Sequence, residues 1–204
     1  MTKVRVLHII KSLGRGGAET LLVETLRHHD REQFEFHFIY FLPWKDQLVN
    51  ELHAAGAASV SCLKATSNMG MLLKVPSLVR YLREKKIDIV HAHLPWAGIV
   101  ARMACSIAGV PLLYTEHNIQ ERYHWTTRWL NKMTFRWQQQ VVAVSADVAK
   151  SIHKNIPTRV PVSVVLNGID TSRFQRSHSH RIEKRQQLGI PENALVVGTI
   201  AVFR

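Results

Sequence analysis

Two histidine motifs stand where apolar runs of the sequence end, and their side chains could contact a ligand. His91-Ala92-His93 ends one run, and Thr115-Glu116-His117-Asn118 ends the next. Residues two apart in a strand share a face, so His91 and His93 could ligate a metal together. No third ligand is evident nearby, so we expect no metal: His93 is predicted to line a cleft and His91 to be a hydrogen-bonded core histidine. His117 is predicted to bind a hydroxyl group or stabilise a developing charge, with a plain surface position as the alternative.

A glycine-rich turn, Gly14-Arg15-Gly16-Gly17, separates the first apolar run from a helical pattern. Glycine lets backbone approach a ligand closely, and a helix N-terminus favours anions, so Gly16 and Gly17 are candidate ligand contacts. The alternative is a turn that only lets helix and strand pack. The pattern differs from G-x-G-x-x-G and no acid follows the second run, which disfavours a nicotinamide cofactor, and we expect no cofactor. Glu19 either contacts the ligand or faces the helix dipole.

Secondary-structure elements must bring these motifs to one place. Along the chain, short β-branched runs alternate with segments of helical periodicity. This alternation predicts an α/β fold with a Rossmann-like open parallel sheet, whose ligands bind beyond the carboxyl ends of the strands. Ser145 follows the sixth strand, where helix capping ranks above ligand binding. The predicted strands are Val4–Ile10, Phe34–Leu42, Ala58–Leu63, Ile87–His91, Pro111–Thr115, Val141–Val144 and Val160–Leu166. The predicted helices are Ala18–His29, Trp44–Ala54, Met71–Glu84, Trp96–Ala108, Ile119–Trp137 and Ser145–His153.

The character of the sequence changes after residue 166. Asn167-Gly168-Ile169-Asp170 reads as a turn, Arg181–Leu188 as a helix and Ala194–Ala201 as a strand. One strand builds no sheet by itself. We therefore expect residues 1–166 to form an N-terminal domain, and residues 167–204 to hold a hinge and the truncated start of a second domain.

The composition indicates an anionic partner. The 204 residues carry a formal net charge of +12, which attracts nucleic acid, nucleotide phosphates or an anionic membrane. No apolar run approaches the length of a membrane span, and the N-terminus lacks the features of a signal peptide, so a cytoplasmic location is expected. The two cysteines, Cys62 and Cys105, are predicted to be buried free thiols.

The predicted helix Ile119–Trp137 combines tryptophans at helical spacing with basic residues. This composition is typical of an interfacial helix on anionic lipid, and it equally fits aromatics that face the core beside solvated bases. Stacking on nucleotides ranks lower, because a parallel sheet with histidines at its strand ends does not resemble an RNA-binding module. The predicted membrane contacts are Arg122, Trp125, Arg128, Trp129, Lys132 and Arg136.

Taken in order, these motifs resemble the family-4 retaining glycosyltransferases of GT-B fold over essentially the whole chain. The matching pieces are Gly16-Gly17-Ala18-Glu19, Val90-His91-Ala92-His93, Tyr114-Thr115-Glu116-His117-Asn118, Val144-Ser145, Val165-Leu166-Asn167-Gly168-Ile169-Asp170 with Phe174, and Leu188-Gly189-Ile190-Pro191 leading to Val196-Val197-Gly198-Thr199. Each piece is weak alone, and their order and spacing make the resemblance specific.

The resemblance implies two Rossmann-like domains across a cleft, with acceptor binding in the N-terminal one and no metal requirement. It implies that Gly16 and Gly17 approach the acceptor and the donor phosphates. His117 would contact the transferred sugar as the catalytic residue, and His93 would line the cleft. The substrate-binding set is Gly16, Gly17, Glu19, His93, Asn118 and Ser145, and the hinge set is Asn167, Gly168 and Asp170.

The implied activity is transfer of a hexose from a nucleotide-diphosphate sugar to a hydroxyl, with retention, in cell-surface polysaccharide or glycolipid biosynthesis. The acceptor would be a glycan or a lipid-linked molecule, and the protein would lie at the inner face of the membrane. The family's donor-phosphate Arg and Lys and its acidic motif lie in the C-terminal domain, so we expect residues 1–204 alone to be inactive. A non-catalytic sugar- or nucleotide-binding module is the alternative, and a nucleic-acid-binding protein, suggested by charge alone, ranks below it.

Overall fold

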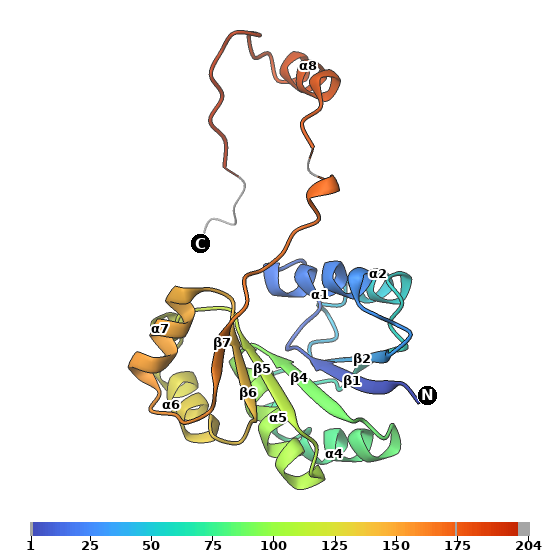
Figure 1. The fold of residues 1–204 in the computed structure, drawn as a ribbon, viewed down its shortest axis with the longest axis vertical. Helices are drawn as coiled ribbons and strands as arrows, with labels where there is room; N and C mark the ends of the chain where they lie inside the picture. The colour runs from blue at the N-terminus through green and yellow to red at the C-terminus, as the bar shows by residue number, and fades with distance from the viewer. Residues whose placement is uncertain (1, 174, 200–204) are drawn as a thin grey trace. The chain divides into compact units, whose positions relative to one another are not determined.

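The computed structural model describes residues 2–173 and 175–199, and its strands form one parallel sheet (Figure 1). In this part of the chain the sheet has seven strands in the order β3-β2-β1-β4-β5-β6-β7, and every neighbouring pair is parallel. The Rossmann-like α/β fold expected from the sequence is confirmed. The strands are β1 (Val4–Ile9), β2 (Phe34–Tyr40), β3 (Ser59–Cys62), β4 (Ile89–His93), β5 (Leu112–Glu116), β6 (Gln140–Ala143) and β7 (Val162–Val164).

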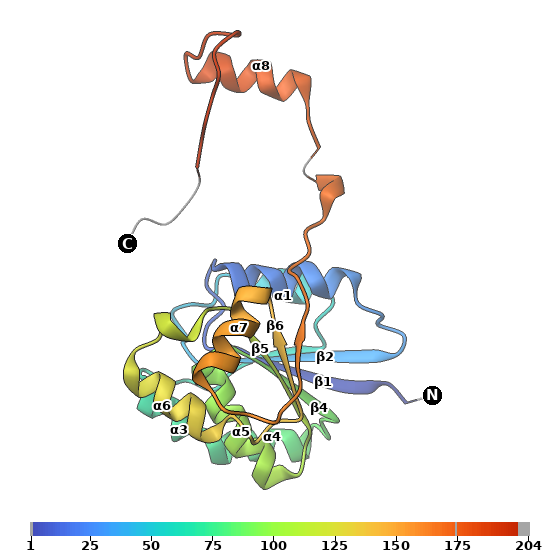
Figure 2. The same cartoon turned by 60° about the vertical axis from the view of Figure 1, so that its left-hand side comes forward.

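Helices pack on both faces of the sheet and enclose two apolar cores. Both views show α1 on the opposite side of the sheet from α4 and α5 (Figure 1, Figure 2). One core joins α1 and α2 to alternate residues of β1 and β2, among them Val6 and Phe38. The larger core joins the other face of the sheet to the other helices of this unit, apart from α6. The α-helices of this unit are α1 (Gly17–His28), α2 (Val49–Ala54), α3 (Asn68–Leu72), α4 (Val75–Glu84), α5 (Pro95–Ala108), α6 (Trp125–Thr134) and α7 (Ala146–Asn155).

The core on the α1 side covers only part of its face of the sheet. Its buried residues come from β1, β2, α1, α2 and the segments beside them, whereas β4, β5 and β6 bury their apolar residues in the core on the opposite face. The carboxyl halves of these three strands therefore present side chains beside α1 that no helix of the larger core covers. This uncovered area is where the histidines of the sequence motifs lie.

The predicted long helix Ile119–Trp137 is wrong in its first third. Residues Gln120–Arg122 form a single 3₁₀ turn, and α6 begins only at Trp125, capped by the His124 side chain. The Gln120 backbone N–H donates to Ser151 Oγ at 2.8 Å, and the Tyr123 hydroxyl donates to the Glu116 carboxylate at 2.5 Å. Tertiary hydrogen bonds therefore hold this segment outside a helix.

Two other predicted helices also have different bounds. The segment expected as Trp44–Ala54 becomes helical only at Val49, because its earlier backbone groups bond to Leu13 and its neighbours. The segment expected as Met71–Glu84 contains the end of α3 and the whole of α4 as separate helices. Pro76 stands in the first turn of α4, where a missing N–H is tolerated, and it could not continue a preceding helix.

The chain divides into two compact units, residues 1–168 and 169–204. In the second unit, a 3₁₀ turn covers Thr171–Arg173 and α8 covers His178–Gln187, so the helix predicted as Arg181–Leu188 starts three residues earlier, at a Ser177 cap. The assignment of residues 167–204 to a hinge and a second domain stays a prediction.

The strand predicted at Ala194–Ala201 is wrong for residues 194–199, which are not in a strand. Ile200 and Ala201 lie outside the described residues, as does Phe174. In the described part of this unit no other strand is available for pairing, and Arg185 instead donates to the Ala194 carbonyl at 2.7 Å. Leu195 and Val197 are consequently exposed, at 93% and 89%. Among the described residues, no helix combines the length and the apolar character that crossing a bilayer requires.

A histidine-lined candidate active site

A cavity of about 220 Å³ lies between α1 and the carboxyl halves of β4, β5 and β6. Its walls are mainly apolar, and its polar groups are mostly imidazoles. None of its lining residues is acidic. They are His8, Ala18, Leu21, Leu22, Thr25, His29, His91, His93, Thr115, His117, Val142, Val144, Val165, Leu166, Asn167 and Gly168. The position agrees with the rule that open parallel sheets bind ligands at the carboxyl ends of their strands.

Strand register accounts for the gathering of the histidines. β1 pairs with β4 so that His8 stands opposite His91, and β4 pairs with β5 so that His93 stands opposite Thr115. Partners in a parallel ladder point to the same face, and so do residues two apart in one strand. His8, His91, His93 and Thr115 therefore project from the α1 face together, although 107 positions separate the first from the last.

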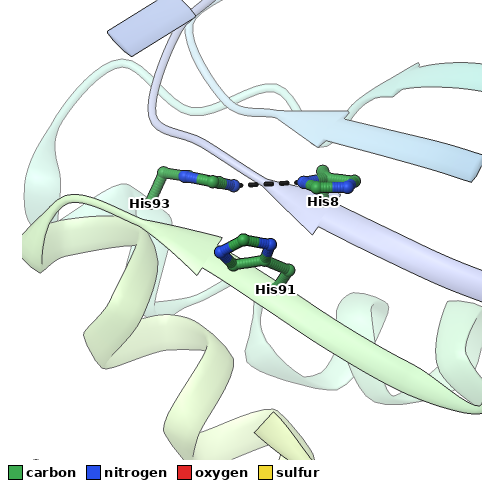
Figure 3. Close-up of side chains that lie close together, drawn as sticks. All are labelled: His8, His91 and His93. Carbon is green, nitrogen blue, oxygen red and sulfur yellow. Dashed lines mark hydrogen bonds between the residues drawn. The ribbon is translucent and has the colours of Figure 1, made fainter. Parts of the chain in front are cut away.

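The imidazoles form a connected row. His8 Nδ1 and His93 Nε2 are hydrogen-bonded at 3.1 Å, and His93 Nδ1 lies 3.4 Å from His117 Nε2. Figure 3 shows the rings of His8 and His93 edge to edge, with His91 beneath them. The His91 ring centroid lies 4.1 Å from that of His93, and its Nε2 is 2.7 Å from Thr115 Oγ1. His91 is thus a hydrogen-bonded histidine that also lines the cavity.

Burial keeps these imidazoles neutral. Removal from water lowers the pKa of His91 to about 3 and that of His117 to about 4, and it lowers the pKa of His8 and His93 well below the ordinary value. Neighbouring imidazoles reinforce the shift for His8, His91 and His93, because a second positive charge in the row would repel the first. At neutral pH each ring therefore offers one N–H donor and one lone pair.

The loop that carries His117 is fastened by the carboxylate of Glu116, which is fully buried. Its Oε1 accepts from the backbone N–H groups of His117 at 3.0 Å and Asn118 at 3.3 Å, and from the Tyr123 hydroxyl. Its Oε2 accepts from the Tyr114 hydroxyl and from Gln120 Nε2, both at 2.7 Å. Burial raises the pKa of Glu116, and the donated hydrogen bonds oppose that rise.

A buried polar network extends from Glu116 to α6. Gln120 accepts from Asn131 Nδ2 at 3.0 Å, and Asn131 Oδ1 accepts from the guanidinium of Arg102 at 2.7 Å. Arg102 is fully buried and also stacks over the ring of Tyr114, 4.5 Å from its centroid. The inward face of α6 is therefore polar, because it supplies acceptors to a buried cation.

The strand end at His93 has an unusual backbone. Leu94, which follows it, has φ 68° and ψ 155°, a conformation that glycine adopts readily and leucine does not. Its N–H donates to the Thr115 carbonyl at 3.3 Å, and Pro95 opens α5 directly afterwards. The sharp turn at Leu94 ends β4 at His93, which fixes that side chain at the edge of the cavity.

The predicted glycine contacts lie at the start of α1. Gly16 is the N-cap and Gly17 the first helical residue, and neither lines the cavity. A Cβ added to Gly17 would meet nothing within 4 Å, whereas one on Gly16 would meet the Glu19 carboxylate. The Glu19 carboxylate accepts from Ser12 Oγ at 3.1 Å. Packing in this unit does not require a glycine at position 17.

The remaining predicted site residues fall in four places. Asn118 belongs to the loop held by Glu116, and Ser145 caps α7 by accepting from the Val148 N–H at 3.2 Å. Asn167 and Gly168 line the cavity. Asp170 lies in the second unit, where its carboxylate accepts from the Ser172 N–H at 3.0 Å. The structure therefore brings His93, His117, Asn167 and Gly168 to the cavity, whereas Gly16, Gly17, Glu19, Asn118, Ser145 and Asp170 are not among its lining residues.

Sequence reasoning missed His8 and His29. His29 follows the end of α1 and lines the cavity, with its ring centroid 6.5 Å from that of His8. A signal for His8 was present, because a titratable side chain interrupts the apolar run of the first strand. Its partners could not be read from the sequence, since they depend on the pairing of β1 with β4.

The tryptophans of α6 face solvent, so the interpretation that they pack in the core is wrong. Trp125 and Trp129 are 69% and 58% exposed, and Met133 is 57% exposed. The buried residues of α6 are instead Thr127, Asn131 and Thr134, which serve the polar network. In the described residues, no ion pair joins the basic side chains of this surface to a carboxylate. We call the α6 surface the exposed side chains of Arg122, Trp125, Arg128, Trp129, Lys132, Met133 and Arg136.

Comparison with known proteins gives a consistent result. The sequence model of Glycosyltransferase Family 4 matches residues 15–173. The chain is 24% identical over 209 residues to the putative glycosyltransferase EpsF of Bacillus subtilis, covering 98% of this chain and 54% of the relative. It is also 24% identical over 210 residues to the UDP-Gal:alpha-D-GlcNAc-diphosphoundecaprenol alpha-1,3-galactosyltransferase of Escherichia coli, covering 96% and 52%.

Solved structures share the fold. HepE of Anabaena, crystallised with UDP and glucose, superposes with a TM-score of 0.74 at 23% identity, over 91% of this chain and 50% of HepE. A glycosyltransferase from Rickettsia africae superposes with a TM-score of 0.71 at 18% identity, over 95% and 51%. The chain therefore spans about half the length of the curated relatives and solved structures that it matches.

Proposed function

We propose, because this chain belongs to Glycosyltransferase Family 4, that its parallel-sheet unit binds the acceptor in a sugar-transfer reaction. In the whole protein, a hexose would pass from a nucleotide-diphosphate sugar to an acceptor hydroxyl, with retention of the anomeric configuration. The carrying observation is the cavity at the strand ends, which presents neutral imidazoles from two adjacent strands and their loops. The biosynthetic role would be in cell-surface polysaccharide or glycolipid assembly.

The imidazole of His117 suits contact with the transferred sugar. Its Nε2 faces His93 Nδ1, which leaves its Nδ1 for a ligand hydroxyl. Positive charge develops on the anomeric carbon as the bond to the diphosphate breaks, and an imidazolium would oppose that charge. Burial lowers the pKa of His117 to about 4, so the ring is neutral at pH 7 and does not oppose it.

The start of α1 suits contact with a diphosphate. Backbone N–H groups of the first helical turn lack partners within the helix, and the helix dipole favours an anion there. The space over Gly17 is open, so backbone at this position is accessible to a phosphate. These features support a role for Gly16 and Gly17 in stabilising the leaving diphosphate, together with cationic groups of the whole protein.

We expect His117→Ala in the whole protein to lower the turnover of sugar transfer by about 100-fold, with little change in thermal unfolding. The size follows from removing one group that stabilises the transition state. The assay measures hexose transfer from radiolabelled UDP-galactose or UDP-glucose to lipid extract, beside His153→Ala as the control. His153 is an exposed histidine of α7 and should leave turnover unchanged. Near-normal turnover of His117→Ala would remove His117 from the mechanism, and a wild-type protein that transfers no sugar from any nucleotide donor would refute the function.

We further propose that the acceptor is lipid-linked and that the α6 surface rests on anionic phospholipid. One relative is named for a diphosphoundecaprenol acceptor. Exposed tryptophans beside exposed basic side chains match the chemistry of an anionic bilayer surface, where aromatic rings sit at the headgroups and each base adds about 1 kcal/mol. Trp125, Arg128, Trp129 and Lys132 also border a groove of about 280 Å³.

Liposome co-sedimentation of this chain tests the contact. Binding to phosphatidylglycerol vesicles should exceed binding to phosphatidylcholine vesicles, and it should fall at least tenfold in Arg128→Glu/Lys132→Glu and in Trp125→Ser/Trp129→Ser. Trp44→Ser is the matched control, because Trp44 is 52% exposed and lies away from α6. Equally weak binding to both lipids would contradict the proposal, as would unchanged binding of the double variants.

A further inference from the structure

Three imidazoles meet on the α1 face of the sheet in an arrangement that the sequence motifs do not show. His91 and His93 come from β4, and the third ring is His8 of β1, which stands opposite His91 in the ladder. One ring nitrogen from each residue lies within 4.8 Å of the other two. Figure 3 shows the three side chains converging from their two strands. The nearby sequence offers no third ligand beside His91-Ala92-His93, and for that reason we expect no metal from the sequence alone. In the folded chain, His8 supplies the third ligand.

The spacing of the facing nitrogens is close to that of a metal site. Two nitrogens bound to a tetrahedral Zn²⁺ at about 2.05 Å are about 3.3 Å apart. His8 Nδ1 and His93 Nε2 are already 3.1 Å apart. The Thr115 hydroxyl occupies His91 Nε2, which leaves His91 Nδ1 for a cation.

Outer partners are also in place for two of the three rings, those of His91 and His93. Metal-bound histidines almost always use their second nitrogen in a hydrogen bond that orients the ring. His91 has Thr115 as that partner at 2.7 Å, and His93 has His117 Nε2 at 3.4 Å from its Nδ1. Buried neutral imidazoles each have a lone pair that can bind a cation, and among the described residues no lysine or arginine lines the cavity to repel one.

We propose that His8, His91 and His93 form a binding site for a divalent transition-metal cation of the Zn²⁺ class. Imidazole ligands favour Zn²⁺, Co²⁺, Ni²⁺ and Cu²⁺ over Mg²⁺ and Ca²⁺, which require oxygen ligands. Three neutral imidazoles do not compensate the double positive charge of the cation. The fourth coordination position of the metal, which faces the cavity, would therefore take hydroxide or an anionic oxygen of a ligand. Occupation by the cation and the His8–His93 hydrogen bond exclude one another.

The site has a consequence for the neighbouring loop. With the cation on Nε2, His93 carries its proton on Nδ1 and donates it to His117 Nε2. The metal would thereby fix the tautomer of His93 and the orientation of the His117 ring. Metal binding itself does not depend on the proposed transferase function, because every ligand belongs to this chain.

Titration of the chelator-treated 204-residue chain with Co²⁺ tests the site. We expect one equivalent to bind with the intense visible absorption of four-coordinate Co²⁺, and Zn²⁺ to displace it. His8→Gln and His91→Gln should each weaken binding at least 100-fold, and Thr115→Val about tenfold. His53→Gln and His153→Gln, which alter exposed histidines, should leave binding unchanged.

Two measurements on the wild-type chain keep the test decisive if a variant fails to fold. Zn²⁺ should raise the thermal unfolding temperature whereas Mg²⁺ should not. X-ray absorption at the zinc edge should count three imidazole ligands. Fewer than three imidazoles, no binding at one equivalent, or equal binding by His8→Gln and wild type would each overturn the proposal.

Discussion

Replacing Glu116 with alanine is expected to reduce the free energy of unfolding by about 3–5 kcal/mol, the size typical of breaking a buried ionic network from one side. The carboxylate accepts five hydrogen bonds, and two of its donors, the Tyr114 hydroxyl and Gln120 Nε2, have no water to replace it. Each buried donor left without an acceptor costs about 1–3 kcal/mol. The buried Arg102, whose charge interacts favourably with Glu116, would also lose compensation.

Urea denaturation of the 204-residue chain measures this loss, and Glu121→Ala supplies a matched control. Glu121 lies five positions further along the same segment and accepts from Ser151 and Asn155, but its side chain is 38% exposed. Water can replace the partners of an exposed carboxylate, so this variant should lose no more than about 1 kcal/mol. Equal losses at the two positions would contradict the role assigned to the buried carboxylate.

A second substitution, Glu116→Gln, separates the positioning of His117 by Glu116 from the contribution of Glu116 to stability in the whole protein. The side chain bonds to the His117 and Asn118 backbone N–H groups but does not line the cavity. Glu116→Gln retains an oxygen that accepts from part of this set and should remain folded. If Glu116 positions His117, this variant should lower turnover by a larger factor than it raises the KM for the acceptor.

Lowering the pH from 7 to 5 is expected to reduce the stability of the metal-free chain by several kcal/mol. Burial lowers the folded pKa of His8, His91, His93 and His117 below the unfolded value of about 6.5, so the unfolded state binds more protons below that pH. The stability is therefore present above pH 6.5 and is lost as the pH falls through it. For His91, whose pKa is lowered to about 3, the loss between pH 7 and 5 is about 2 kcal/mol.

The other titratable groups that line the cavity with His8, His91 and His93 are the imidazoles of His29 and His117. Among the described residues, no carboxylate lines it. Burial raises the pKa of Glu116, and this shift acts on stability in the opposite direction. Urea denaturation with a chelator present measures the slope, and His91→Gln should flatten it. A free energy of unfolding that is constant between pH 7 and 5 would contradict neutral burial of the row.

Much of the fold followed from local pattern. The alternation of β-branched runs with helical periods predicts the parallel sheet and its strand count, because side-chain periodicity and apolar content act within each segment. The motifs at the strand ends also placed His93 and His117 at one edge. Predictions failed where distant groups compete for the backbone, as when Ser151 and Glu116 hold residues 119–124 outside an α-helix.

The exposed tryptophans show a second limit of prediction from the local sequence pattern. Trp125 and Trp129 have helical spacing and would ordinarily face a core. The buried Arg102, however, needs hydrogen-bond acceptors, which leucine or tryptophan could not supply. The face of α6 that carries these acceptors is therefore buried, and the tryptophans face solvent. Which face of an amphipathic helix is buried depends on what lies opposite. That partner is on α5, 29 residues before Asn131, and no local rule relates the two.

The sequence by itself therefore determined the α/β class, the family resemblance and the delivery of two histidine motifs to the carboxyl edge of a sheet. Tertiary structure decided which residues share the cavity, since the β1–β4 ladder sets His8 opposite His91 and creates a three-imidazole cluster. It also decided the ionisation of that cluster, because a pKa depends on the water and charge around a group. Strand pairing and burial are relations between distant segments, and a single segment does not encode them.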